Sequence, residues 1–448
     1  MSKIETNEQQ RRLDYWPRFQ NSTMMAALAL LHQYDVFETW PAEKLLAYQL
    51  QQAHRLVTFA QRTVPYYQDR LKGIAQIDAN EFSMNHFRQL PILKREGLQR
   101  ADRSILSNAV PKSHGVRTES FTSGSTASPI RTYSNNHLKI FTRANSLRTH
   151  RWHQRDPYGT FADLRPTRHG TAGSLRRWSW LPDGGFGHTI NLNQSLQDIL
   201  SEIIDLDPDY LHTRPRALLE LVRISEMEGR RPASLKQALI FGETLEQDYR
   251  DEIVETWGID LLENYSAVEV SSIATQCGTG GKLHVMSESV ICEIVDEDGD
   301  EVAPGEVGTV LITALHNYCA PLIRYEVGDY AMRGSACNCG RNLPTIEKVI
   351  GRTKNILVLP NGERHFPTSL NLISREAPIL QWRLHQENLT DLELSLKVAR
   401  ALTAAEEEAV RNCIRKLFGY PFNIELIYVD ELFRNPGDKY REFTSNVV

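Results

Sequence analysis

The 448-residue chain has no long apolar run, few cysteines and no strong excess of either charge. Its longest uninterrupted apolar run, Met24–Leu31, is far shorter than the roughly 20 residues of a membrane-spanning helix. The first residues lack the apolar segment of a secretory signal. Six cysteines in so long a chain do not form a disulfide scaffold, and a net charge of -5 argues against a nucleic-acid surface. We therefore expect a cytoplasmic protein with no membrane or nucleic-acid partner.

A Walker A loop is also absent, because no G-x-x-x-x-G-K-[ST] pattern occurs. Residues 120–129 instead read Ser-Phe-Thr-Ser-Gly-Ser-Thr-Ala-Ser-Pro, with hydroxyl side chains on both sides of Gly124. Backbone N–H groups and hydroxyls in such a loop can surround a phosphate without a dedicated charge. The alternative is an ordinary Ser/Thr-rich surface turn.

The length and the hydrophobic pattern predict an α/β protein of two or three domains. Between about 196 and 270, amphipathic helices alternate with short apolar strands such as Gln237–Phe241, a rhythm typical of a mainly parallel sheet flanked by helices. Residues 41–72 have helical spacing, and 289–295 and 308–315 are β-rich. The large N-terminal domain is thus expected to carry mainly parallel sheets and a β-rich subdomain.

The pattern changes after Gly351-Arg352. Alternating apolar residues near 380–384 and 392–398, a helix near 409–417 and a strand at 422–429 predict a small α+β domain. We expect two domains, residues 1–352 and 353–448.

Four short segments stand where a nucleotide-binding sheet presents its loops. They are Phe241-Gly-Glu-Thr244, Tyr265-Ser-Ala-Val-Glu269, Arg324-Tyr-Glu-Val-Gly-Asp329 and Gly351-Arg-Thr-Lys354. They offer a glycine for close backbone approach, an aromatic ring for stacking, and acids for a metal ion or ribose hydroxyls.

Together with Thr122–Pro129, these segments resemble the adenylate-forming superfamily in order and rough spacing. The resemblance is strongest to its phenylacetate–CoA ligase branch, including capsule-biosynthesis-type relatives. It is carried by Pro321-Leu-Ile-Arg-Tyr325, by Cys337-Asn-Cys-Gly-Arg341 and by Val64-Pro-Tyr-Tyr67 after an N-terminal helix. It covers nearly the whole chain.

The resemblance implies an ATP-dependent enzyme that activates a small carboxylic acid as an acyl-adenylate and transfers it to a thiol. The β- and γ-phosphates would lie on Thr122, Ser123, Gly124, Ser125 and Thr126. Gly242 and Glu243 would border the adenine, and Tyr265 would stack on it. Ser266, next to Tyr265, would also contact the nucleotide. Glu269 would coordinate Mg²⁺, Asp329 would bind the ribose hydroxyls, and Arg352 would reach the ribose or the α-phosphate.

The resemblance also implies a catalytic lysine near the C-terminus. Arg434-Asn-Pro-Gly-Asp-Lys439-Tyr-Arg441 is similar to the family's Pro-x-x-x-Gly-Lys ending, so Lys439 would close over the site for adenylation and swing away for the second half-reaction. A carboxylate needs no activating base, so positioning and charge neutralisation suffice for its attack on phosphorus.

Several positions depart from the family pattern. Ala127 replaces a loop glycine, Ser266 and Val268 replace Gly and Thr, Lys354 replaces a hinge Asp, and Asp438 replaces the glycine before Lys439. None removes a principal charge, so we expect an active enzyme. A protein that only binds nucleotide, or that transfers AMP, is the alternative.

Four potential metal ligands form the pattern C-x₆-H…C-x-C: Cys277, His284, Cys337 and Cys339. Such ligands close a tetrahedral structural zinc site, although C-x-C is less diagnostic than C-x-x-C. Buried free thiols are the alternative.

The sequence does not identify the acid. We expect its pocket to involve parts of 150–190 together with residues near 212–214 and 240–245. Trp178, Trp180, Phe186, His188 and His212 favour an aromatic or polar-aromatic acid, although surface packing explains them equally well. The acceptor is expected to be CoA, with a separate carrier protein or an amine as alternatives, and the protein to be a monomer or homodimer.

Overall fold

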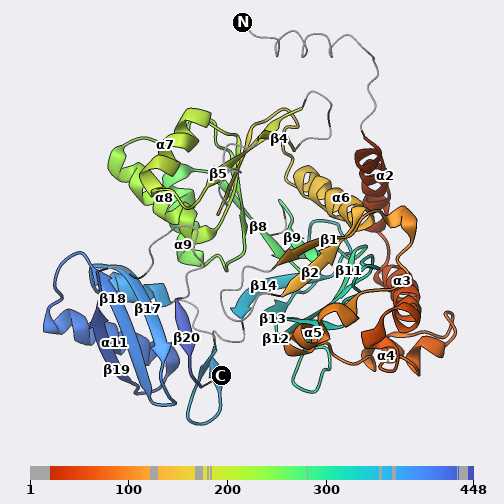
Figure 1. The fold of residues 1–448 in the computed structure, drawn as a ribbon. Helices are drawn as coiled ribbons and strands as arrows, with labels where there is room; N and C mark the ends of the chain where they lie inside the picture. Colours follow the sequence, from red (N-terminus) through yellow and green to blue (C-terminus); the bar gives the residue numbers. More distant parts are fainter. Residues whose placement is uncertain are drawn as a thin grey trace, which may run out of the picture.

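The computed structural model describes residues 21–121, 130–166, 175–178, 181, 184–279, 281–352, 356–365, 370–430, 432 and 442–447. Figure 1 shows a large part built around one long sheet and a small C-terminal part with a sheet of its own. None of the helices in these ranges combines the length and hydropathy that crossing a membrane requires.

The large sheet contains twelve strands in the order β11-β12-β13-β14-β10-β9-β8-β7-β6-β3-β5-β4. Strands β5, β3, β6, β7 and β8 run parallel to one another. Strand β4 and all strands from β9 to β14 pair antiparallel with their neighbours. The β-rich segment expected as a subdomain therefore continues the same sheet. The bounds are β3 Phe161–Arg165, β4 Leu175–Arg177, β5 Phe186–Asn191, β6 Tyr210–Thr213, β7 Gln237–Phe241, β8 Asp260–Ala267, β9 Ser271–Gln276, β10 Leu283–Val285, β11 Val290–Val295, β12 Val307–Ala314, β13 Tyr325–Arg333 and β14 Thr345–Arg352.

Helices cover the parallel strands on one face. These are α7 (Leu196–Leu206), α8 (Pro215–Glu228) and α9 (Gln247–Trp257), which Figure 1 shows grouped together. Helix α8 begins with Pro215, whose missing N–H costs nothing at a first turn, and ends at Gly229 in the left-handed conformation. Ala162, Leu164, Leu211, Ala238 and Ile240 face these helices in one core. Because strand side chains alternate, the intervening residues face the other way.

On that other face lies α6 (Asn136–Trp152), which begins where the Asn135 side chain accepts from the Leu138 N–H. Helix α2 (Ser22–Phe37) packs on α6 through Met24, Ala27, Leu31 and Tyr34, which contact Ala144 and Leu147. The sequence interpretation had assigned neither helix.

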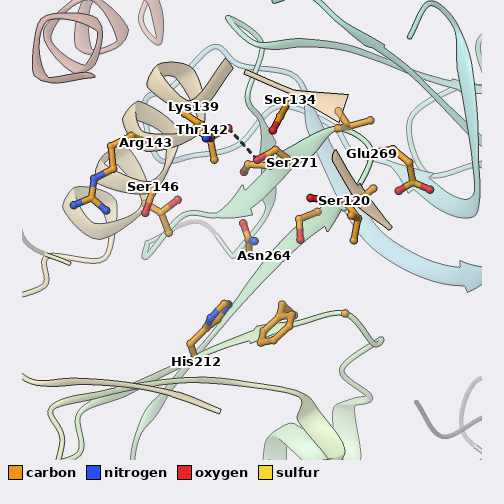
Figure 2. A pocket seen from close by; sticks show the side chains of 18 of the residues that line it. Ser120, Ser134, Lys139, Thr142, Arg143, Ser146, His212, Asn264, Glu269 and Ser271 are labelled. Atoms are coloured by element: carbon orange, nitrogen blue, oxygen red, sulfur yellow. Dashed lines mark hydrogen bonds between the residues drawn. The ribbon is translucent and has the colours of Figure 1, made fainter. Parts of the chain in front are cut away.

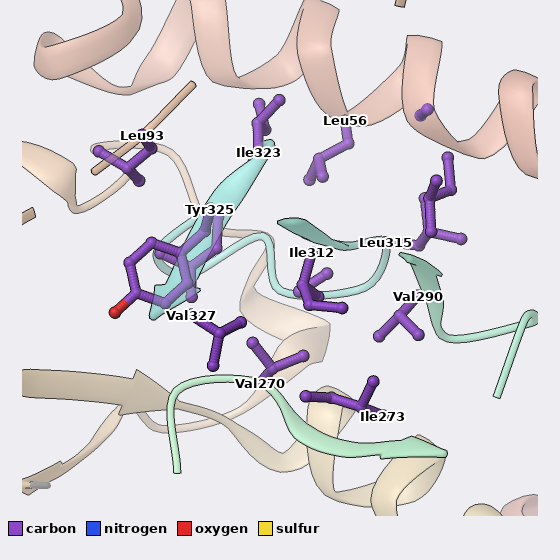
Figure 3. Packing of buried hydrophobic residues seen from close by; sticks show 14 of the residues in the cluster. Leu56, Leu93, Val270, Ile273, Val290, Ile312, Leu315, Ile323, Tyr325 and Val327 are labelled. Atoms are coloured by element: carbon purple, nitrogen blue, oxygen red, sulfur yellow. The ribbon is translucent and has the colours of Figure 1, made fainter. Parts of the chain in front are cut away.

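A second core joins the N-terminal helices to the antiparallel strands. Leu56 of α3 (Ala42–Thr63) lies above Ile312 and Ile323 (Figure 3). The expectation that this helix continues to residue 72 is wrong. Val64 is extended because it precedes Pro65, and a short 3₁₀ turn follows. The other short helices are α4 Met84–Arg88, α5 Arg95–Ala101, η1 Pro65–Tyr67, η2 Ile74–Gln76, η3 Asp102–Ile105 and η4 Lys112–His114.

The small part has a four-stranded sheet of order β19-β18-β17-β20. Leu384 and Leu394 of the sheet pack against Val410 and Ile414 of the helix α11, as the alternating pattern predicts. The bounds are β15 Leu357–Val358, β16 Arg364–His365, η6 Leu370–Leu372, α10 Ile373–Glu376, β17 Ile379–Gln386, β18 Asp391–Val398, α11 Ala404–Phe418, β19 Asn423–Tyr428 and β20 Phe443–Ser445. The predicted boundary at 352/353 adjoins residues 353–355, which lie outside the described ranges, and it stays a prediction.

The two parts contact each other beside α8 and α9. The Glu442 carboxylate accepts from Arg216 Nη1 at 3.1 Å and from Tyr249 Oη at 2.6 Å. Arg375 of the small part also pairs with Asp248 at 3.3 Å. Residue 442 is thereby fixed near the start of α8.

Candidate functional site

A cavity of about 760 Å³ lies between α6 and the carboxyl ends of the parallel strands (Figure 2). Binding sites in α/β sheets form at this edge, because the loops that follow the strands meet there. One wall is α6, and the other consists of residues from β3, β6, β7, β8 and the β8–β9 turn. The lining includes Ser120, Ser134, Lys139, Thr142, Arg143, Ser146, His150, Phe161, Trp178, His212, Arg214, Phe241, Gly242, Asn264, Ser266, Glu269 and Ser272.

Glu269 is the single carboxylate among the described lining residues. It lies in the tight turn between β8 and β9, where Ser271 takes a positive φ of 78°. Its side chain is only 8% exposed, with the Tyr325 hydroxyl 3.4 Å from Oε1 and Arg95 Nη1 at 3.8 Å. Neither contact is short, so the carboxylate keeps lone pairs for a cation in the cavity.

Tyr265 and Asp329 come from different strands and meet at this edge. The Tyr265 hydroxyl donates to Asp329 Oδ2 at 3.0 Å, and the ring is largely buried. Asp329 follows Gly328, whose φ of 86° favours glycine, and pairs in register with Arg352 of β14. The acid, the aromatic ring and the Arg352 backbone therefore lie close together. The side chain of Arg352 lies outside the described set.

Gly242 follows β7 with a φ of 80° and borders the cavity. Next to it, Glu243 Oε1 lies 3.8 Å from Nη1 of Arg214, the residue that directly follows β6. Two adjacent strand ends are thus linked at the predicted adenine side.

The hairpin of β1 (Thr118–Phe121) and β2 (Arg131–Ser134) brackets the hydroxyl-rich loop. Ser120 and Ser134 of this hairpin line the cavity. The predicted phosphate-binding residues Thr122, Ser123, Gly124, Ser125 and Thr126, with Ala127, lie outside the described ranges. Lys439, Lys354 and Asp438 also lie outside them.

The deep end of the cavity is polar and aromatic. Phe161 and Trp178 lie 6.1 Å apart between ring centroids, and His150 lies 4.6 Å from Trp178. His212 Nδ1 is 3.1 Å from Oδ1 of the buried Asp163, which also pairs with Arg165. Burial favours a raised Asp163 pKa, but the hydrogen bond from His212 and the charge of Arg165 hold this pKa below its usual value.

A separate cluster contains the four potential metal ligands. Cys277 follows β9, His284 lies in β10, and Cys337 and Cys339 lie between β13 and β14. Strand β10 pairs with both β9 and β14, which brings the distant segments together. The ligand atoms all lie within 4.8 Å of one another.

The distances in this cluster fit a tetrahedral ion. Cys277 Sγ and Cys337 Sγ are 3.7 Å apart, and Cys339 Sγ is 3.3 Å from His284 Nε2. Bonds of about 2.3 Å from sulfur to zinc give a tetrahedron edge of about 3.8 Å. A disulfide would require about 2.05 Å. Burial lowers the pKa of His284 to about 4, which keeps the imidazole neutral, the form that binds metal.

Comparison with known proteins finds sequence similarity to ligases. A comparison with protein-family profiles finds no match. The chain is 28% identical to phenylacetate–coenzyme A ligase of Thermus thermophilus over 358 residues, which cover 76% of this chain and 77% of that enzyme. It is 26% identical to the Escherichia coli enzyme of the same name over 442 residues, 91% of this chain and 97% of that one. The chain is a relative of phenylacetate–CoA ligases.

The fold comparison agrees. A crystal structure of 2-hydroxyisobutyryl-CoA ligase in the postadenylation state superimposes with a TM-score of 0.75 at 16% identity, covering 92% of this chain and 91% of that one. The same ligase in the thioesterification state gives 0.61. The resemblance stated from the motifs is confirmed, and so is the fold of an adenylate-forming enzyme.

Among the predicted site residues that the structure describes, Gly242, Ser266 and Glu269 line one cavity, and the four potential metal ligands form one cluster. Glu243 and Asp329 are not among the lining residues, and the roles assigned to all of these residues stay predictions. Helix α6 was missed, and with it Lys139, Arg143 and Ser146, because its cavity side is polar and gives little periodic signal. The expectation that His188 belongs to the acid pocket is wrong. Its register with Ala162 puts His188 on the sheet face opposite the cavity.

Proposed function

We propose that the protein is an ATP-dependent acid–thiol ligase that forms an acyl-adenylate and passes the acyl group to CoA. The observation that carries the proposal is that Gly242, Ser266 and Glu269 line one cavity, in a chain similar to phenylacetate–CoA ligases over most of its length. The Tyr265–Asp329 pair lies next to Ser266 along the chain. These residues come from three separate motifs.

The proposed roles follow from position. The hydroxyl-rich residues 122–126 hold the β- and γ-phosphates at the end of the β1–β2 hairpin, and Asp329 accepts hydrogen bonds from the ribose hydroxyls. Glu269 is the residue that would hold Mg²⁺, because it is the cavity's described carboxylate and oxygen is the ligand that this ion prefers. When bound, Mg²⁺ would neutralise phosphate charge.

The chemistry needs no protein nucleophile. A carboxylate oxygen of the acid attacks the α-phosphorus, the bond to pyrophosphate breaks, and the acyl-adenylate forms. The sulfur of CoA then attacks the acyl carbonyl, and AMP leaves. The protein's part is to align two anions and to stabilise developing charge, which Lys439 and Arg352 are proposed to do. A carrier protein or an amine is the alternative acceptor.

A panel of carboxylic acids tests this function. We expect pyrophosphate release from ATP that requires an acid, and thioester that requires CoA as well. Acid-dependent release without thioester would indicate a different acceptor. Acid-independent AMP transfer would replace the ligase proposal with that of a nucleotide-transferring protein. Gel filtration will test the expectation of a monomer or homodimer, and cell fractionation that of a cytoplasmic location.

We also propose one structural zinc ion on Cys277, His284, Cys337 and Cys339. It is favoured by the ligand distances and by the closed Cys₃His set, which leaves no position for substrate. Zinc here would fasten β9, β10 and the β13–β14 loop together.

Zinc binding predicts a stability effect that exceeds the catalytic one. Elemental analysis is expected to find one zinc per chain. Cys339→Ser is expected to lower Tm by roughly 5–10 °C, because the ion stabilises only the folded state, while turnover per folded molecule changes little. Cys413→Ser is the matched control, because Cys413 is a half-buried free thiol in α11, away from the metal ligands. This variant should change zinc content and Tm little. Zinc-free protein with an unchanged Tm would contradict the site.

A further inference from the structure

The deep end of the cavity contains a side chain arranged to accept a hydrogen bond. His212 Nδ1 faces the Asp163 carboxylate at 3.1 Å, and Asp163 is 99% buried, being only 1% exposed. A carboxylate only accepts, so Nδ1 carries the proton, and in a neutral ring Nε2 keeps its lone pair. Among the described residues, Nε2 has no hydrogen-bond partner of its own, and His212 lines the cavity.

The ring is held in place by its surroundings. Phe241 lies against it with centroids 4.1 Å apart and planes at 33°, and Phe161 lies 6.1 Å away. Figure 2 shows His212 at the opposite end of the cavity from Ser134, with Asn264 between them. Burial lowers the His212 pKa against the opposing effect of Asp163, which supports a neutral ring at pH 7.

The distance to the reaction centre suits one aromatic ring. His212 is in register with Leu239, and Leu239 with Leu262, whereas Ser266 lies four positions farther along β8. Four strand residues span about 13 Å along the sheet, and the two strand spacings from β6 to β8 add about 9.5 Å across it, so the two backbones are about 16 Å apart. The His212 and Ser266 side chains occupy part of this distance, and an aromatic ring with a short linker fits in the space that is left. Phe161, Trp178 and Phe241 provide an aromatic lining for such a ring.

We propose that the activated acid carries a hydroxyl group on an aromatic ring, and that His212 Nε2 accepts the hydrogen bond from this hydroxyl. Asp163 is the positioning residue that fixes the tautomer. This inference rests on the proposed ligase function and names the substrate class for it.

A second carboxylate on the substrate is the rival, since Lys139 and Arg143 also line the cavity. Both belong to α6, the wall opposite β6. Arg143 Nη2 donates to the backbone oxygen of Trp178 at 3.2 Å, and Lys139 is exposed. Arg165 also lines the cavity at the His212 end, but it pairs with the Asp163 carboxylate behind the ring, so its positive charge is already offset. A neutral hydroxyl donor fits this end better.

The test compares kcat/KM for four acids that differ at one ring position: phenylacetate and its para-hydroxy, para-methoxy and para-carboxy derivatives. In the unaltered protein, we expect the hydroxylated acid to exceed the others by at least about tenfold, because a site that accepts from a hydroxyl discriminates against analogues without one. His212→Phe keeps the ring and should lower kcat/KM for the hydroxylated acid by about 10- to 100-fold, leaving phenylacetate within about threefold. His188→Phe, on the opposite sheet face, is the control and should leave the ranking unchanged.

Asp163→Asn tests whether Asp163 sets the His212 tautomer or only supports the fold. An amide can donate to Nδ1, so the imidazole proton moves to Nε2 and the ring becomes a donor toward the cavity. The preference for hydroxy over methoxy should then fall by about tenfold, and this ratio is independent of how much protein is folded. If this variant does not fold, the His212→Phe variant still tests whether His212 causes the preference for the hydroxylated acid.

The outcomes separate the two proposals. If none of a broad acid panel gives pyrophosphate release, the ligase function fails. If acids are activated but the hydroxyl gives no advantage, or the advantage survives His212→Phe, only the hydroxyl inference is overturned. Preference for the para-carboxy acid overturns it in favour of a dicarboxylic substrate.

Discussion

Glu269→Gln is expected to lower acid-dependent ATP–pyrophosphate exchange by at least about 10²-fold, because it removes the one carboxylate described in the cavity lining. The amide keeps the size of the side chain and can still meet the Tyr325 hydroxyl, now 3.4 Å from Oε1. It cannot offset the charge of a divalent cation. The loss should therefore appear in turnover and in the Mg²⁺ concentration that half-saturates the enzyme.

The matched control is Glu252→Gln in α9. Glu252 pairs with Arg223 at 2.6 Å on the surface and does not line the cavity, so its loss removes an ion pair but no proposed metal ligand. Activity and Tm should stay near those of the unaltered protein, since exposed pairs contribute about 0–1 kcal/mol. If Glu269→Gln exchanges pyrophosphate at the normal rate and with normal Mg²⁺ dependence, the metal assignment is wrong.

The parallel half of the sheet could be predicted because its elements carry strong periodic signals. Gln237–Phe241 matches β7 at both ends, and α9, Gln247–Trp257, is one of the amphipathic helices expected between about 196 and 270. Short apolar strands between amphipathic helices leave few other topologies. The C-terminal sheet could be predicted in the same way, because leucines alternate along its strand β18.

Helix α6 could not be predicted because it serves two surfaces at once. Ala144 and Leu147 face α2, whereas Lys139 and Ser146 face the cavity. A helix with a polar functional side and a narrow buried side has no clear apolar stripe. The same reason hid half of the substrate cavity.

The metal cluster was predictable in identity but not in geometry. The sequence shows Cys277 and Cys337 far apart along the chain, and only the pairing of β10 with both β9 and β14 brings them to 3.7 Å. The Asp163–His212 pair gave no local signal at all. Its residues lie on adjacent parallel strands, and their contact depends on the register of β3 and β6.

The proposed closing lysine has an anchor point in the structure. Glu442, three residues after Lys439, is fixed to Arg216 and Tyr249. Arg216 lies two residues from Arg214, which lines the cavity.

Lys439→Ala is expected to suppress adenylate formation by about 10²- to 10³-fold or more, because a preorganised positive charge at the developing phosphate anion is lost. The same variant should still convert a supplied acyl-adenylate to its thioester at a near-normal rate. In that half-reaction, the small domain is proposed to have turned about residues 353–355 and to have carried the lysine away. Single-turnover assays of each half-reaction, with purified acyl-adenylate for the second, measure the two effects separately.

Lys354→Pro is the converse variant. Proline fixes φ within the proposed hinge, so rotation should be hindered while the first step is spared. Adenylate formation should then persist and thioester formation should fall. Opposite patterns in the two variants would establish that one lysine serves one half-reaction and that rotation of the small domain serves the other. Equal loss of both half-reactions in both variants would contradict the alternating-domain mechanism for this protein, and would leave residue 439 with a structural role at the contact held by Glu442.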